Sequence, residues 1–386
     1  IFNDNRLQTT DERIFVELKW DHPLGVDNRI KSRIYYDRYR FEGSYPYDYP
    51  PVTINRDYVL GQWIGGEITY DQKIASHHIL LGSELAYHFD ARQKNYDVAP
   101  LNVYLDDNQS FTNWSVYGQE EWNIARWVRL IGGLRFDRYS TFGTQLSPRA
   151  GVIFMPTEAS TIKFLYGQAF RAPNVYEMYY KASTGSSIYR ENLDLKPETI
   201  HTYEMVMEQE ISSVLKISAS GFHYEAKDLI SQQVNAGDGS LQFLNVNKVK
   251  SDGVEAGIEV NWPGLFKGQV SYSYQETKDD QTGQWLANSP RHLVKANARV
   301  PLYRNMVFLG GLFRYMGSRC DRDGNSVGDA AAMDIILSAE WKRLNGSIGA
   351  YNIFDYVSAD PVSADHTQKA IQQNGRNFWF KVGYTF

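Results

Sequence analysis

The chain has 386 residues, a formal net charge of −5 and 14% aromatic residues, with one cysteine. This composition excludes an intrinsically disordered protein and a disulfide framework, and the mild acidity gives no reason to expect nucleic acid as a partner. No apolar run approaches the roughly 18 residues of a membrane helix, and mean hydropathy is −0.47. A membrane β-barrel stays compatible with these values, because its strands alternate apolar and polar residues.

Alternation with a period of two runs along the whole chain. In the first such segment one face carries Ile14, Val16, Leu18 and Trp20. The same stripe recurs near residues 58–70, 79–89, 252–262 and 377–386. Altogether we count about seventeen segments of roughly 10 residues, the length of a tilted β-strand that crosses a bilayer. The other segments lie near 28–41, 113–122, 127–139, 147–156, 161–171, 199–209, 214–226, 266–276, 292–300, 306–316, 332–341 and 345–354.

The connections between these segments alternate between short and long. We expect long connections at 42–57, 90–112, 140–146, 172–198, 227–251, 277–291, 317–331 and 355–374, of which 140–146 is brief. A soluble β-sandwich has no physical reason to keep this rhythm, and its strands are shorter. The pattern predicts an all-β, transmembrane antiparallel β-barrel, with long extracellular loops, short periplasmic turns and aromatic residues at the strand ends. The C-terminal strand then ends on the periplasmic side.

Six ordered motifs resemble TonB-dependent outer-membrane receptors. They are the strand Leu130–Tyr139, the tetrapeptide Phe170–Pro173 (FRAP), Asn192–Thr199 followed by Tyr203 and Glu204, Gly253–Glu255, Asn352–Asp355, and Gly375 and Arg376 with the terminal Phe386. The resemblance covers residues 110–386 by motif and residues 1–109 by strand pattern only. It implies a barrel of 22 strands preceded by a globular plug. We therefore expect residues 1–386 to be a partial receptor barrel, without the plug and the first strands.

The resemblance also implies a function. The expected protein lies in the outer membrane of a Gram-negative bacterium and imports a scarce chelate, with a ferric siderophore as first choice. Energy comes from the TonB–ExbB–ExbD complex, which contacts the region before this chain. No enzyme activity, catalytic residue or resident cofactor is implied. The last strand is the signal that the barrel-assembly machinery reads, and its alternate residues are Phe378, Phe380, Val382, Tyr384 and Phe386.

The ligand should contact the long loops, where aromatic rings offer stiff contact area and Arg offers a fork for anionic oxygens. Loop 172–198 is the richest, and its candidates are Arg171, Tyr176, Tyr179, Tyr180, Tyr189 and Arg190. A second aromatic loop contains Tyr47 beside Tyr45 and Tyr49, and Trp285 is a lone candidate. The alternative is that these tyrosines only line the loops and the girdle of the barrel.

Other ligands and classes have weaker support. Cobalamin is the second choice and haem the third, because no His lies between Pro173 and Asn192, and only His366 of the eight histidines lies in a long loop. A calcium loop at Asp321–Asp329 lacks the Gly and Glu that it needs at Ser326 and Ala332. A passive porin, a structural barrel and a soluble β-rich hydrolase with paired carboxylates are the alternatives from other classes. Cys320 has no partner cysteine.

Overall fold

The computed structural model describes residues 4–48, 52–184, 187–362 and 368–386. Strands dominate this part of the chain, and its single helix has five residues. The elements are β1 (Gln8–Pro23), β2 (Asn28–Tyr47), β3 (Thr53–Ile74), β4 (His77–Val98), β5 (Leu101–Ala125), β6 (Val128–Tyr139), β7 (Gly143–Thr157), β8 (Ser160–Arg171), α1 (Val175–Tyr179), β9 (Ala182–Thr184), β10 (Ser187–Arg190), β11 (Glu198–Ser212), β12 (Leu215–Val234), β13 (Leu241–Trp262), β14 (Phe266–Asp279), β15 (His292–Tyr303), β16 (Val307–Met316), β17 (Arg319–Cys320), β18 (Ser326–Val327), β19 (Ala330–Trp341), β20 (Leu344–Tyr351), β21 (Ala359–Pro361), β22 (Ala370–Gln372) and β23 (Asn377–Tyr384).

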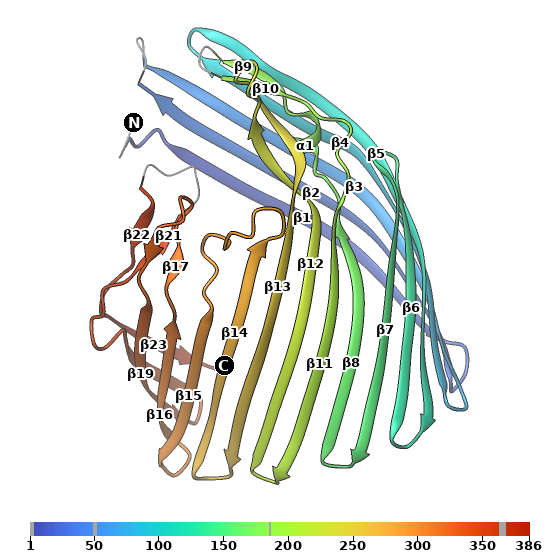
Figure 1. Ribbon diagram of the computed structural model, residues 1–386, viewed down its shortest axis with the longest axis vertical. Helices are drawn as coiled ribbons and strands as arrows, with labels where there is room; N and C mark the ends of the chain where they lie inside the picture. The colour runs from blue at the N-terminus through green and yellow to red at the C-terminus, as the bar shows by residue number, and fades with distance from the viewer. Residues whose placement is uncertain (1–3, 49–51, 185–186, 363–367) are drawn as a thin grey trace.

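The strands form one curved wall in which each strand is antiparallel to its neighbours in the wall (Figure 1). The 19-stranded sheet consists of the short β9 and β10 and of seventeen wall strands, as the sequence predicted. The wall runs from β1 through β8, continues with β11–β16 and ends with β19, β20 and β23. Among the described residues no pairing joins β1 to β23, so the wall has two edges.

The expectation of long loops at 42–57, 90–112 and 227–251 was wrong. Only residues 48–52 separate β2 from β3, residues 99–100 separate β4 from β5, and residues 235–240 separate β12 from β13. In each case the two strands continue their hydrogen-bonded ladder beyond the apolar stripe, so β5 reaches 25 residues. Polar side chains ended the predicted strands, whereas the backbone pairing that extends a hairpin does not depend on an apolar face.

Apolar side chains point away from the barrel. Val16 and Leu18 of β1 are 65% and 72% exposed, and Phe380 of β23 is 81% exposed. Only five hydrophobic residues of the described chain are buried: Ala86, Leu105, Met178, Ala182 and Leu195. A soluble sandwich would bury its apolar stripes, so these exposed stripes are the lipid-facing band of a membrane barrel. No helix among the described residues is long and apolar enough to cross a membrane.

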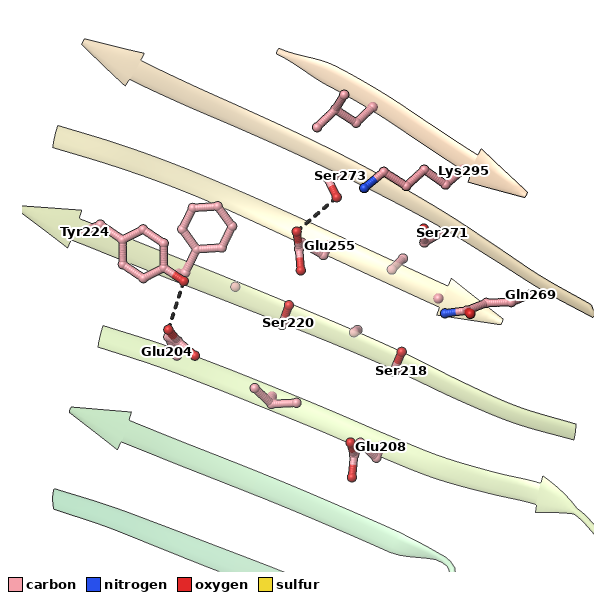
Figure 2. A pocket seen from close by; sticks show the side chains of 17 residues that line it. Glu204, Glu208, Ser218, Ser220, Tyr224, Glu255, Gln269, Ser271, Ser273 and Lys295 are labelled. Carbon is pink, nitrogen blue, oxygen red and sulfur yellow. Dashed lines mark hydrogen bonds between the residues drawn. The ribbon is translucent and has the colours of Figure 1, made fainter. Parts of the chain in front are cut away.

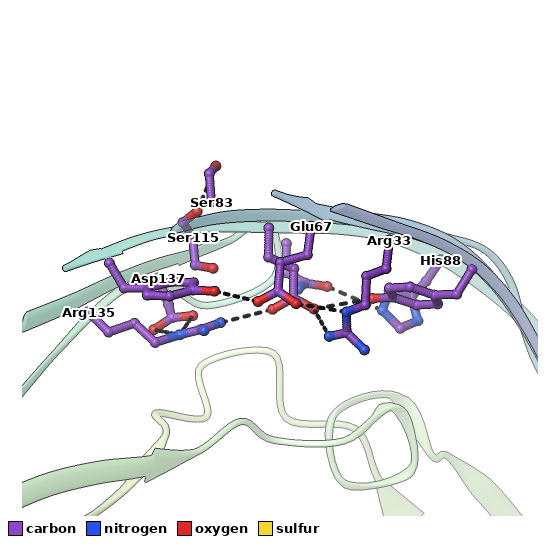
Figure 3. A network of polar contacts seen from close by, with 11 residues as sticks. Arg33, Glu67, Ser83, His88, Ser115, Arg135 and Asp137 are labelled. Atoms are coloured by element: carbon purple, nitrogen blue, oxygen red, sulfur yellow. Dashed lines mark hydrogen bonds and ion pairs between the residues drawn. The ribbon is translucent and has the colours of Figure 1, made fainter. Parts of the chain in front are cut away.

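A polar network covers the lumen face of β2–β6 (Figure 3). Glu67 and Glu84 lie directly opposite each other on β3 and β4, an arrangement that repels unless it is neutralised. Arg33 Nε donates to Glu67 at 2.7 Å and Arg135 Nη2 donates to Glu84 at 3.2 Å. The hydroxyl of Tyr117 donates to Glu67 at 2.5 Å. Guanidinium groups from β2 and β6 therefore neutralise the central pair and connect five strands into one rigid plate.

Candidate functional site

Segment 172–197 leaves the wall after β8 and folds across the upper mouth of the barrel (Figure 1). Its helix α1 begins with a capping box, in which Asn174 Oδ1 accepts from Glu177 N and the Glu177 carboxylate accepts from Asn174 N. Gln93 of β4 donates to the carbonyl of Val175 at 3.0 Å. At its other end β10 pairs in parallel with β13, with Tyr189 opposite Leu241. The segment is thus attached to both sides of the mouth.

Arg171 organises the start of this segment. Its Nη1 and Nη2 donate to Glu177 at 2.9 Å each, and its Nε and Nη2 donate to Glu198 at 2.7 and 2.6 Å. The two carboxylates are 11% and 17% exposed. The guanidinium therefore joins the end of β8, helix α1 and the start of β11. The donors of Arg171 face protein carboxylates in this structure, and its expected contact with a ligand stays a prediction.

Three of the predicted tyrosines form one aromatic cluster. The ring of Tyr180 lies 4.6 Å from that of Tyr176 and 5.4 Å from that of Tyr189, and Phe243 of β13 lies 5.6 Å from Tyr176. Burial, followed by the nearby Tyr176 and Asp57, raises the pKa of the Tyr180 hydroxyl. We call Tyr176, Tyr180, Tyr189 and Phe243 the mouth cluster. It gives the segment a continuous aromatic surface.

The remaining predicted residues lie around this cluster or apart from it. Tyr47 interacts electrostatically with Tyr180, and burial raises the pKa of Tyr179. Arg190 is held by Asp238 at 2.6 Å. Trp285 belongs to a different contact set, because its ring lies under Lys278 and Arg291, at 4.2 and 3.6 Å. Tyr49 and His366 lie outside the described residues.

A cavity of about 470 Å³ opens on the lumen face of β11–β15 (Figure 2). Glu204 accepts from the Tyr224 hydroxyl at 2.8 Å, and Glu255 accepts from the Ser273 hydroxyl at 3.0 Å. Neither carboxylate has an ion pair among the described residues, in contrast to the neutralised plate on β2–β6. The cavity therefore holds two carboxylates that accept hydrogen bonds from hydroxyl groups and carry no ion pair among the described residues.

The acidic loop 317–329 is held by hydrogen bonds between its own residues. Asp321 Oδ1 accepts from the backbone N–H groups of Asp323 and Asn325, at 2.9 and 2.8 Å. Within the described ranges, no group of three or more His, Cys, Asp or Glu could hold a metal ion. The buried Arg319 pairs with Asp360 at 2.8 Å, and Cys320 is a free thiol. The Asp321 carboxylate therefore holds the turn of this loop through the backbone and the side-chain amide of Asn325.

Residues that the sequence did not single out hold the site together. Gln93, Glu177, Glu198 and Phe243 belong to elements that are distant in the chain; Gln93 lies 82 positions before Val175. Glu198 and Glu177 carry a local signal, since Glu198 stands inside the motif that follows Asn192 and Glu177 stands three residues after Asn174, the spacing of a capping box.

Comparison with known proteins places these features in context. A family description, "TonB dependent receptor-like, beta-barrel", matches residues 1–360. The iron-regulated outer membrane virulence protein of Vibrio cholerae is 25% identical over 303 residues, which cover 72% of this chain and 45% of that protein. A hemin receptor of Yersinia pestis is 26% identical, covering 67% and 41%, and a vitamin B12 transporter of Vibrio cholerae is 29% identical, covering 69% and 41%. The chain thus spans less than half the length of these relatives.

Solved structures share the fold at low sequence identity. The copper transporter OprC superposes with a TM-score of 0.81 at 18% identity, over 98% of this chain and 66% of that chain. A ferric enterobactin receptor of Pseudomonas aeruginosa gives a TM-score of 0.81 at 17% identity, over 98% of this chain and 62% of that chain.

Proposed function

Since the chain belongs to the TonB-dependent receptors, as part of their outer-membrane β-barrel, we propose that it serves the binding and import of a scarce chelate, with a ferric siderophore as first choice. The observation that carries this proposal is the segment 172–197. It is fixed across the mouth by Arg171 and Gln93 and presents the mouth cluster above a polar lumen. A rigid aromatic surface over a hydrated passage suits capture of a bulky chelate at the outer side, followed by its passage through the wall.

The chain accounts for only part of the machinery. The edges at β1 and β23 expose unpaired backbone groups that lipid cannot satisfy. We propose that further strands close the wall, and that a plug preceding them fills the lumen against the carboxylates Glu204 and Glu255. The TonB–ExbB–ExbD complex then supplies the energy through that plug, and the barrel-assembly machinery recognises the terminal strand with Phe386.

Cobalamin is the second candidate ligand, and the 29% identity to a vitamin B12 transporter favours it. Haem is the third, supported by a relative named as a hemin receptor. Segment 172–197 contributes no histidine to either ligand. A passive pore agrees less well with a mouth that is bridged by an attached segment.

Binding to the receptor in detergent, followed by tryptophan quenching, tests the proposal. The panel contains ferric siderophores of the catecholate and hydroxamate types, cyanocobalamin and haemin. We expect sub-micromolar binding of one ferric siderophore, weakened by Tyr180→Ala and left unchanged by Trp341→Phe on the lipid-facing side of β19. Absence of binding across the whole panel would refute the import of an iron chelate, and binding of cyanocobalamin alone would replace the first choice by the second.

A further inference from the structure

The outer face of β12, β13 and β14, which lie side by side in the wall (Figure 1), changes from apolar to charged along the strands. Val254 and Ile258 of β13 are 55% and 51% exposed and belong to the lipid-facing band. Lys250 lies on the same face, because alternate side chains of a strand point to the same side. The register pairs Lys250 with Glu225 of β12 and with Lys278 of β14, so these side chains also point outward. The cavity of Figure 2 opens on the opposite face, toward the lumen.

We call the five cations of this charged region the outer cation belt, and its members are Lys227, Lys248, Lys250, Lys278 and Arg291. Glu225 contacts Lys227 at 3.0 Å and Lys248 at 2.6 Å. Asp280 contacts Lys248 at 2.9 Å and Lys250 at 2.7 Å. Three ammonium groups therefore share two carboxylates. Because each ammonium has three N–H donors and these lysine side chains are 32–40% exposed, some donors stay available to a ligand.

Two lysines of the belt face each other across neighbouring strands. Lys250 and Lys278 are directly opposite partners, and like charges in this position repel unless an anion compensates them. Lys278 contacts Glu276 at 3.1 Å, whereas Lys250 contacts Asp280, so no carboxylate of the described residues contacts both. The remaining carboxylate of these paired rows, Asp252, is held by a histidine of β12. Five cations thus stand against four carboxylates, although the whole chain is acidic.

Trp285 lies at the rim of the belt. It forms a β-bridge with Lys278, and its ring lies 4.2 Å from the Lys278 ammonium and 3.6 Å from the Arg291 guanidinium. Tryptophan is typical of the boundary between a membrane and water, because its ring is apolar and its N–H is polar. Lys227 pairs with Thr199, which follows segment 172–197 by two residues, so the belt lies at the end of the wall that this segment covers. Trp285 and the belt are therefore at the level of the outer lipid headgroups.

We propose that the outer cation belt binds the phosphate groups of a bis-phosphorylated glycolipid in the outer leaflet of the membrane. The belt continues the lipid-facing band, so a lipid whose acyl chains lie against Val254 and Ile258 places its headgroup beside the lysines. A phosphate between Lys250 and Lys278 compensates the repulsion of the two ammonium groups and accepts charge-assisted hydrogen bonds from them. The proposal goes beyond the import of a chelate, because the belt faces away from the lumen.

The test measures lipid binding to the receptor in detergent by native mass spectrometry. Three lipids are compared: bis-phosphorylated lipid A, the same glycolipid without its phosphates, and phosphatidylglycerol. The variant Lys250→Gln with Lys278→Gln removes two charges of the belt and keeps side chains of similar length. The control is Lys216→Gln with Lys267→Gln, which removes two charges from the lumen face of the same β12 and β14. The heat-modified electrophoretic shift of the barrel checks folding of each variant.

We expect bis-phosphorylated lipid A to bind the unsubstituted receptor more tightly than either other lipid. Its Kd should rise about 30-fold in the Lys250→Gln, Lys278→Gln variant, because each lysine near a lipid surface contributes about one tenfold step or less, and should not change in the control. Trp285→Leu should weaken the glycolipid with and without phosphates by the same factor, since the ring contacts the lipid independently of its charge.

Four results would overturn the proposal. One is equal Kd values for the glycolipid with and without phosphates. Another is an unchanged Kd for bis-phosphorylated lipid A in the Lys250→Gln, Lys278→Gln variant, and a third is an equal loss in the lumen control. Binding of phosphatidylglycerol as tight as that of lipid A would show a general anionic surface in place of a glycolipid site. Each of these results leaves the import of a chelate intact, because chelate binding is measured separately.

Discussion

Replacement of Arg171 by Ala should release α1 from the mouth without unfolding the barrel. The change leaves the carboxylates of Glu177 and Glu198 without a cation while both stay mostly buried. Removing one partner of a fully buried pair costs about 3–5 kcal/mol, and an exposed pair contributes about 0–1 kcal/mol. Because the Arg171 side chain is 44% exposed, we expect the substitution to weaken the docking of α1 by about 2 kcal/mol. This loss corresponds to a roughly 30-fold larger population in which α1 is undocked.

Hydrogen exchange followed by mass spectrometry measures this opening. The amides of Met178 and Tyr180 donate to the carbonyls of Asn174 and Tyr176, at 3.1 and 3.2 Å, and their exchange should accelerate about 30-fold. The exchange rate in Arg171→Lys should lie between those of the unsubstituted protein and of Arg171→Ala, since an ammonium group keeps the charge but loses the bidentate geometry of the guanidinium. Arg190→Ala is the control, because its pair with Asp238 is exposed. Unchanged exchange in Arg171→Ala, or an equal acceleration in Arg190→Ala, would refute this role of Arg171.

Three further predictions follow from the wall and the loops. Gly82→Ala should destabilise the barrel by about 1–3 kcal/mol, because a methyl group there collides with the ring of Tyr117, whereas Gly132→Ala, with no atom within 4 Å, should be neutral in thermal denaturation. The pKa of Asp238 is lowered to about 2 by hydrogen bonds from Ser240 and by Arg190. The ionised Asp238 carboxylate therefore stabilises loop 235–240 fully above its pKa in the unfolded chain, and this stabilisation is lost as the pH falls from about 4 to about 2. Hydrogen exchange in the loop should depend on pH in this range, and Asp238→Asn should remove that pH dependence. Ile258→Lys on the lipid face should cost about 2–4 kcal/mol in refolding into vesicles, and Asn297→Lys on the lumen face much less.

The outward-facing apolar stripes show that a local pattern can predict which face of a strand is exposed. Val16 and Leu18 were placed on one face by their spacing alone, and that face is exposed in the structure. The period of two is a property of every strand, so it holds wherever one face must be apolar. The same reasoning failed at 90–112, where β4 and β5 continue as a polar hairpin. The buried face of that hairpin carries polar side chains such as Gln93, Asn95 and Asp97, so no apolar stripe marks the pairing.

The candidate site shows which contacts could not be predicted from the sequence. It indicated that segment 172–198 is rich in Tyr and Arg, and three of its tyrosines do lie together. It did not indicate that Arg171 faces Glu177 and Glu198, nor that Gln93 reaches Val175. The contact role of the predicted residues stays a prediction.

The sequence by itself determined the class of fold, the number of wall strands and the face that meets lipid, because each depends on residues that are neighbours or next neighbours in the chain. Tertiary structure alone decided which charges neutralise one another, how segment 172–197 is attached and where the outer cation belt lies. Those features depend on register between strands, which brings Glu67 opposite Glu84 and Gln93 within reach of Val175. The short turn between β3 and β4 fixes the register of that one hairpin, whereas the contact of Gln93 with Val175 depends on where α1 docks, which no single segment of sequence contains.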